Sequence, residues 1–187
     1  NLLGTNADGD SDELERNVIA GRTDNTNGVL NLESSTGNVV AGNFIGVGAD
    51  GTTPIEGSYT GILMRFGSVA QTIGGTTEAE RNVIAGQRWS GIAIGGEDSY
   101  GNIVQGNSIG VDALGNPLGN GHYGIQLGSS GNLIGGAQPG EGNVIANNNW
   151  SGVAVGGNTQ GNEIRGNSMY ANGGLGIDLA DNGVTPN

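Results

Sequence analysis

Short segments of three kinds recur along the whole chain, and in each of them apolar residues alternate with polar or small ones. This alternation is the period of a β-strand, and no stretch has the i, i+3, i+4 spacing of an amphipathic helix. The three kinds follow one another in a fixed order, and the series occurs six times. The first kind begins at Asn1, Asn38, Gln71, Asn102, Asn132 and Asn162, the second at Asn17, Asn43, Asn82, Asn107, Asn143 and Asn167, and the third at Gly28, Gly61, Gly91, Gly124, Gly152 and Gly176.

A repeated unit of three short strands is typical of a solenoid in which each rung, meaning one turn of three strands, packs only on its neighbours. Gly-rich corners between the segments permit the sharp bends that such a rung requires. We therefore expect an all-β chain, folded over residues 1–187 as a single right-handed parallel β-helix of about six rungs. The third segment of the first rung is irregular, so that Val29-Leu30-Asn31-Leu32 could be shifted by one residue relative to the other rungs.

Asparagine stands at the head of the first and second segments in nearly every rung. Stacked side-chain amides can hydrogen-bond to one another and to backbone groups at a bend, which would otherwise lack partners. We expect these residues to form structural ladders rather than a ligand site.

Composition and charge narrow the possible partners. Aromatic residues make up 4% of the chain, so the core must be built from many small aliphatic contacts along an axis. The formal net charge is −12 and the chain has no Lys, so its surface repels phosphate backbones and anionic lipid. Nucleic acid and membranes are thus not expected as partners, and the absence of Cys excludes disulfides.

Three longer motifs are similar to those of a known group of proteins. They are IGGTTEAERNVI at 73–84, GNSIGVD at 106–112 and NGGLGIDL at 172–179. Their combination resembles the right-handed parallel β-helix repeats of large secreted bacterial proteins, which belong structurally with the pectate-lyase-like superfamily. The resemblance covers essentially the whole chain, and it implies an extracellular or cell-surface location.

Neither end of the predicted solenoid shows a capping helix in the sequence. An open end exposes unpaired strand edges and an apolar cross-section. We expect that the chain is a fragment of a longer repeat protein, or that copies of it associate end to end.

Ring-bearing residues recur at one position of the rung, two residues before the Gly that opens the third segment. From the first rung to the sixth this position holds Thr26, Tyr59, Trp89, His122, Trp150 and Gly174. Flat rings stack on the faces of sugars, so Tyr59, Trp89, His122 and Trp150 predict a polysaccharide-binding platform. The alternative is an aromatic ladder that only stabilises the corner, with each pair contributing about 0.5–1.5 kcal/mol.

One acidic segment is a candidate metal site. Asp8, Asp10 and Asp12 occupy alternate positions of an oxygen-rich loop, which is a plausible arrangement for binding Ca²⁺. The segment lacks the Gly and the final Glu of an EF-hand loop and occurs only once. A solvated acidic loop without a metal is the alternative interpretation.

The arrangement of acidic residues and of the single His in the sequence gives little support for a catalytic function. Polysaccharide lyases of the superfamily use acidic Ca²⁺ ligands and a basic residue, and its hydrolases use clustered Asp. The outward positions of the second and third segments carry no acid cluster. His122, the only His, lies near no recognisable nucleophile. We favour a non-catalytic structural or adhesive module that binds polysaccharide, with a lyase or hydrolase using the loop carboxylates of Asp50, Glu56, Asp98 or Asp112 as the alternative.

Overall fold

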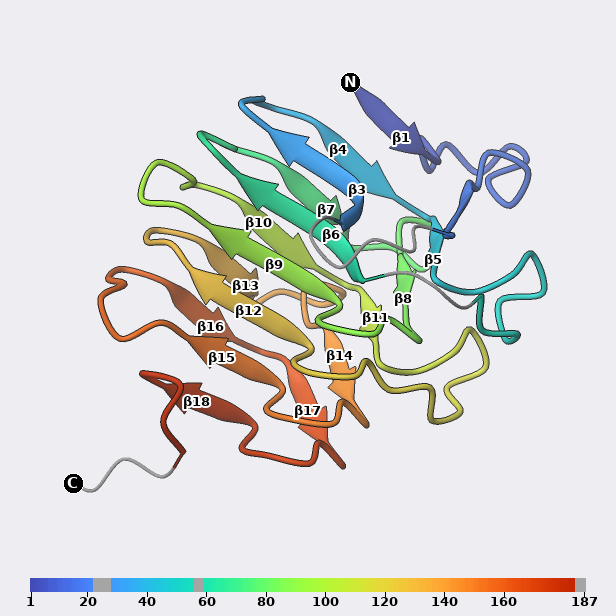
Figure 1. The fold of residues 1–187 in the computed structure, drawn as a ribbon. Coiled ribbons are helices and arrows are strands. Elements are labelled where there is room, and N and C mark those ends of the chain that lie inside the picture. Colours follow the sequence, from blue (N-terminus) through green and yellow to red (C-terminus); the bar gives the residue numbers. More distant parts are fainter. Residues whose placement is uncertain (22–27, 56–58, 184–187) are drawn as a thin grey trace.

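The computed structural model describes residues 1–21, 28–55 and 59–183, and these fold as a parallel β-helix without any α-helix. The strands form three sheets of six parallel strands each, and within every sheet the strands follow one another in chain order. Figure 1 shows the rungs stacked from the N-terminal strand at the top to β18 at the bottom. The predicted fold class and the number of rungs are thus confirmed. Among the described residues there is no helix of the length and apolarity needed to cross a membrane.

The strands are short, and each sheet takes one strand from every rung. The first sheet consists of β1 (Leu2–Gly4), β4 (Val39–Ala41), β7 (Thr72–Gly74), β10 (Ile103–Gln105), β13 (Leu133–Gly135) and β16 (Glu163–Arg165). The second consists of β2 (Val18–Ile19), β5 (Phe44–Ile45), β8 (Val83–Ile84), β11 (Ser108–Ile109), β14 (Val144–Ala146) and β17 (Ser168–Tyr170). The third consists of β3 (Gly28–Glu33), β6 (Thr60–Arg65), β9 (Ile92–Gly95), β12 (Ile125–Gly128), β15 (Val153–Val155) and β18 (Ile177–Leu179).

The core is a set of aliphatic files that run along the axis. In the second sheet, for example, Ile45 pairs with Ile84 and Ile109 with Ile145, and all four side chains are fully buried. Equivalent files from the other two sheets join them in one apolar cluster. Because every rung adds the same few apolar side chains, the core grows with length and needs no large aromatic residue.

The third strand of the first rung has a different register from the one that its opening Gly suggested. Gly28 pairs with Thr60 rather than with Gly61, and Leu30 pairs with Ile62. Leu30 and Leu32 therefore occupy the inward register, and Leu32 is buried. The shift of one residue, which the sequence left open, is the arrangement that places leucine at both inward positions.

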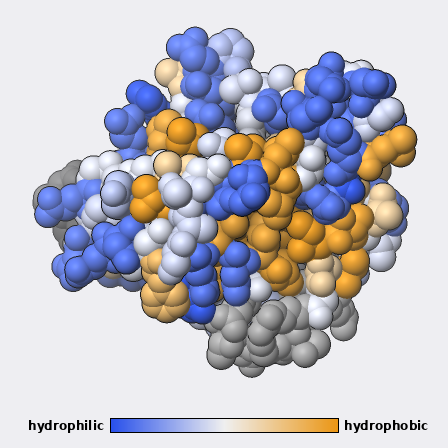
Figure 2. All heavy atoms as spheres, turned by 90° about the horizontal axis from the view of Figure 1, so that it is seen from above, coloured by the Kyte–Doolittle hydropathy of each residue, from blue (hydrophilic) through white to orange (hydrophobic). Residues whose placement is uncertain are grey.

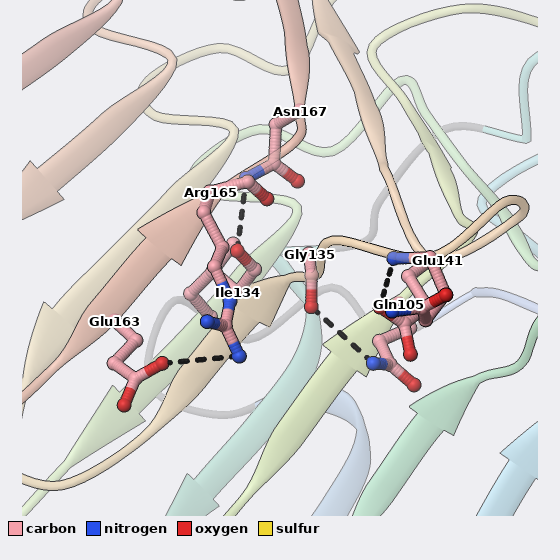
Figure 3. A network of polar contacts seen from close by, with 8 residues as sticks. Gln105, Ile134, Gly135, Glu141, Glu163, Arg165 and Asn167 are labelled. Atoms are coloured by element: carbon pink, nitrogen blue, oxygen red, sulfur yellow. Dashed lines mark hydrogen bonds and ion pairs between the residues drawn. The ribbon is translucent and has the colours of Figure 1, made fainter.

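The two predicted amide ladders are present. In most rungs the side-chain amide and the backbone N–H of the ladder residue donate to the side-chain oxygen of the next rung, as Asn143 does to Asn167 at 2.8 and 3.0 Å. At Gln71 the backbone N–H makes this bond to Asn102, and the side-chain amide donates instead to the carbonyl of Ser35. The second ladder also reaches back to the first sheet, since Asn167 Nδ2 donates to the carbonyl of Ile134 at 2.9 Å (Figure 3). The ladder residues Asn43, Asn82, Asn102, Asn107 and Asn143 are at most 1% exposed, so these amides satisfy backbone groups that water cannot reach.

A third ladder was not predicted. Gln87, Asn120, Asn148 and Asn172 lie four residues before the Gly that opens the third segment, and the backbone N–H of each donates to the side-chain oxygen of the next. Asn120 Nδ2 also donates to Asn148 Oδ1, at 2.8 Å. The fixed spacing was visible in the sequence, but these residues lie in loops rather than at the head of a strand.

Long loops cover the outward face of the second sheet. The outward side chains of Phe44 and Val83 are buried rather than exposed, and they form a separate apolar cluster with Val47 and Ala85, against which Leu118 packs. The loops that follow β5 and β11 lie next to each other, joined by a hydrogen bond from Ala113 N to Gly51 O at 2.9 Å. Figure 1 shows these loops projecting from the same side of the solenoid.

The N-terminal end of the solenoid presents apolar surface. Leu2 is 49% and Val18 is 44% exposed, and each lies on the outermost described strand of its sheet. Figure 2, seen from above the view of Figure 1, shows hydrophobic residues gathered in one area with hydrophilic ones around it. End-to-end association stays a prediction.

Candidate functional site

Four rings lie in a row at one corner of the solenoid, where the sequence placed them. Tyr59, Trp89 and His122 are stacked, and the Trp150 ring is tilted by 41° to that of His122. The ring centroids are 5.5 Å apart between Tyr59 and Trp89, 3.8 Å between Trp89 and His122, and 4.2 Å between His122 and Trp150. The backbone holds this register, because in each rung the residue's N–H donates to the carbonyl of the ring-bearing residue before it, at 2.7–3.0 Å. We call these four residues the aromatic file. Thr26, which the pattern placed before Tyr59, lies outside the described residues.

The stacking limits which ring faces a ligand can reach. The ring planes of Tyr59 and His122 lie at 11° and 19° to that of Trp89, one in the rung before it and one in the rung after. Both faces of the Trp89 indole are therefore occupied within the file, and a sugar can reach only its edge. Trp150, in contrast, is 53% exposed. A platform formed by the faces of both indoles does not fit this geometry, because of the two only the Trp150 indole has a ring of the file on a single side.

The aromatic file ends at a hollow beside Trp150. The next residue in register is Gly174, whose N–H donates to the Trp150 carbonyl at 3.0 Å and which adds no side chain to the stack. A Cβ at Gly174 would lie 2.8 Å from Ser151 Oγ, so a larger residue here would require Ser151 to shift. The resulting hollow has a volume of about 610 Å³, and its lining includes Leu175, Asp178 and Asp181 beside Trp150. This volume lies within the range of ligand-binding pockets, and the lining offers both apolar and polar groups.

Tyr123 connects the aromatic file to the carboxylates of the hollow. Its ring lies edge-on to His122 and Trp150, and its hydroxyl donates to Asp181 Oδ1 at 2.5 Å. Burial and the hydrogen bond to Asp181, together with the charges of Asp181 and Asp178, raise the pKa of Tyr123 well above its ordinary value. The phenol is therefore a permanent donor, and it fixes the position of the Asp181 carboxylate.

The segment that carries Asp181 is held against the last rung. Asp178 is 6% exposed and accepts hydrogen bonds from the backbone N–H groups of Asn182 and Gly183 at 3.2 and 3.1 Å. Ala180 N donates to the Val155 carbonyl at 2.8 Å. The repeat pattern did not identify the residues of this site other than Trp150, namely Tyr123, Leu175, Asp178 and Asp181. Tyr123 follows the aromatic-file position directly, but no repeat marks Asp181.

His122 is a member of the aromatic file. Its ring lies between the two indoles, and Nδ1 is buried with no hydrogen-bond partner among the described residues. Burial lowers the pKa of His122 below its ordinary value, although the charge of Asp181 opposes this shift. The imidazole is therefore neutral near pH 7, and its contacts are those of a flat ring packed between others.

The acidic loop near the N-terminus is folded around its own carboxylates. Asp8 Oδ1 accepts from Asp10 N at 2.9 Å, and Asp12 Oδ1 accepts from the Thr5 hydroxyl at 2.9 Å. Within residues 1–21, 28–55 and 59–183, no three or more His, Cys, Asp and Glu side chains are grouped to hold a metal ion. Calcium binding by Asp8, Asp10 and Asp12 stays a prediction.

The loop carboxylates considered for catalysis have structural partners or lie apart. Hydrogen bonds from the Thr53 hydroxyl and the N–H groups of Thr53 and Thr52 hold the pKa of Asp50 well below its ordinary value. Burial would raise the pKa of Asp112, but hydrogen bonds from Asn116 and from the Leu114 N–H outweigh it and lower the pKa. Both carboxylates are thus ionised, and each accepts hydrogen bonds that stabilise its own loop. Asp98 is exposed on a different corner, and Glu56 lies outside the described residues.

Comparison with known proteins adds no family to this picture. No protein-family model matches the chain, and no curated protein or solved structure matches it. The geometry of the aromatic file and the hollow is therefore the basis for a functional interpretation.

Proposed function

We propose that the chain is a non-catalytic β-helix module that binds polysaccharide, with the exposed face of Trp150 as the main contact. The observation that carries the proposal is the end of the aromatic file. A row of three stacked rings ends in the tilted indole of Trp150, which is 53% exposed and lies beside a hollow of about 610 Å³. An exposed indole face is suited to the C–H face of a sugar ring, and the polar groups around the hollow can fix the orientation of the ring.

The other members of the aromatic file have a supporting role in this proposal. Tyr59, Trp89 and His122 hold the Trp150 indole in place through their stacking. Each of them is partly exposed, so their edges extend the contact surface along the corner for further sugar units. A polysaccharide would thus lie along the solenoid axis, with one unit against Trp150.

The repeats also suggest where such a module works. We infer an extracellular or cell-surface location and a structural or adhesive role, in a protein of the secreted bacterial, pectate-lyase-like type. Binding of Ca²⁺ by Asp8, Asp10 and Asp12 would stabilise the long loop of the first rung in such a setting. The repeat motifs and the acidic surface, with a net charge of −12, support this interpretation.

The test is affinity electrophoresis through gels that contain neutral, acidic or basic polysaccharides, combined with an assay for new reducing ends in the same samples. We expect the chain to be retarded by at least one polysaccharide without cleaving it. Trp150→Ala should weaken the retardation more than about tenfold, because an exposed aromatic residue at the centre of a site carries much of the binding free energy.

The matched control is Tyr100→Ala, which removes another exposed aromatic side chain, from a loop that does not line the hollow. It should bind as the unaltered chain does, and circular dichroism should show both variants folded. Equal retardation of Trp150→Ala and the unaltered chain would contradict the proposal. New reducing ends would instead support the lyase or hydrolase alternative.

A further inference from the structure

The charged side chains that line the hollow beside Trp150 are all acidic. Asp178 and Asp181 both line it, and no Lys, Arg or His is among the described residues that do so. The whole chain contains no Lys and has a formal net charge of −12, so no distant excess of positive charge compensates these two carboxylates. A ligand group that enters the hollow therefore meets a negative potential.

The two carboxylates have different remaining capacities to accept hydrogen bonds. Asp178 is almost fully buried, and its two oxygens already accept from the N–H groups of Asn182 and Gly183. Asp181 uses Oδ1 to accept from the Tyr123 hydroxyl, which leaves Oδ2 as an acceptor for a ligand. Because the phenol fixes this carboxylate, Asp181 needs no rearrangement to accept a hydrogen bond beside the Trp150 indole.

We propose that the hollow selects a sugar unit that carries a free, protonated amine, as in an oligosaccharide of glucosamine. This inference rests on the proposed polysaccharide binding. The sugar ring lies on the Trp150 face, and its ammonium group donates to Asp181 Oδ2. A hydrogen bond between two charged groups is stronger than one to a neutral hydroxyl or acetamide, and a uronate carboxylate is repelled. The affinity thus falls from glucosamine to N-acetylglucosamine to galacturonate units.

The test is a titration, followed by calorimetry, with oligosaccharides of equal length made of glucosamine, N-acetylglucosamine or galacturonate. It is carried out at mildly acidic pH, where the sugar amine is protonated. We expect the glucosamine oligomer to bind about five- to tenfold more tightly than the N-acetylglucosamine oligomer, as a charge-assisted hydrogen bond predicts. High salt should reduce this preference.

The decisive variant is Asp181→Asn, which removes the charge but keeps an oxygen for the Tyr123 hydroxyl. It should lose the preference for glucosamine and bind the N-acetylglucosamine oligomer unchanged. Asp98→Asn makes the same change of charge at an exposed position away from the hollow, and it should keep the preference. Trp150→Ala should weaken the binding of both oligomers.

The possible failures are distinguishable. Equal affinity for the glucosamine and N-acetylglucosamine oligomers, or a preference for galacturonate, would overturn the inference and leave polysaccharide binding in place. Undiminished binding of the glucosamine oligomer to Trp150→Ala would reveal a non-specific attraction to the acidic surface, and would also overturn it. If no oligosaccharide or polysaccharide binds, the proposed function fails, and the inference fails with it.

Discussion

Replacing Asn82 with alanine should lower the free energy of unfolding by about 3–5 kcal/mol, since each buried polar group left without a partner costs about 1–3 kcal/mol. Asn82 is fully buried, and its Nδ2 donates to the carbonyl of Val40 and to Asn107 Oδ1, both at 2.8 Å. Its Oδ1 accepts from Asn43 N at 2.9 Å. The substitution therefore leaves a carbonyl, an N–H group and an amide oxygen without this partner in the interior of the solenoid. Urea unfolding followed by circular dichroism measures the loss.

Asn158→Ala is the control for this prediction, because Asn158 is exposed in the loop after β15 and belongs to none of the three ladders. It should change the free energy of unfolding by no more than about 0.5 kcal/mol. A loss below about 1 kcal/mol for Asn82→Ala would mean that water replaces the missing amide, and that the ladders do not hold the rungs together.

Replacing Gly74 with alanine should destabilise the chain by more than about 3 kcal/mol, since backbone strain and a steric clash both act there. Gly74 has a φ of +84°, and a Cβ would lie 2.0 Å from the Gln105 carbonyl oxygen of the next rung. The side chain of Asn107, a ladder residue, would be 2.6 Å away. The added methyl group must therefore push apart two rungs where an amide ladder joins them. Thermal unfolding gives the measurement.

The variant Gly115→Ala separates the effect of backbone strain from that of the steric clash. Gly115 has nearly the same φ, +82°, but a Cβ there would meet nothing within 4 Å. It should cost only the strain of a left-handed residue, about 1 kcal/mol. Similar losses of stability in the two variants would show that the rungs can separate at little cost. That result would contradict the importance of the close contact at Gly74.

The sequence was sufficient for the parts of the molecule that repeat. Apolar alternation placed the strands, and recurring Asn and ring-bearing residues placed two ladders and the aromatic file, because in a solenoid a fixed position in the repeat becomes a fixed position in space. The register of β3 was left open by its irregular segment, and pairing of Leu30 with Ile62 decides it.

The parts that do not repeat could not be predicted. The burial of Phe44 and Val83 depends on how long loops fold over the second sheet, and loop conformation leaves no period in the sequence. The contact between Tyr123 and Asp181 joins residues 58 positions apart through the last turn of the chain. For the same reason the hollow beside Trp150 was not foreseen: it depends on the missing side chain at Gly174 and on the segment that carries Asp181.

The central claim is that a sugar binds on the face of Trp150, and fluorescence tests it most directly because the chain contains two Trp residues. Trp89→Phe leaves Trp150 as the single tryptophan, and Trp150→Phe leaves Trp89, whose faces are covered by Tyr59 and His122. Titration of both variants with the glucosamine oligomer should give a saturable change in the emission of Trp150 and none in that of Trp89. Binding that leaves the Trp150 emission unchanged, or that alters the Trp89 emission instead, would contradict the account.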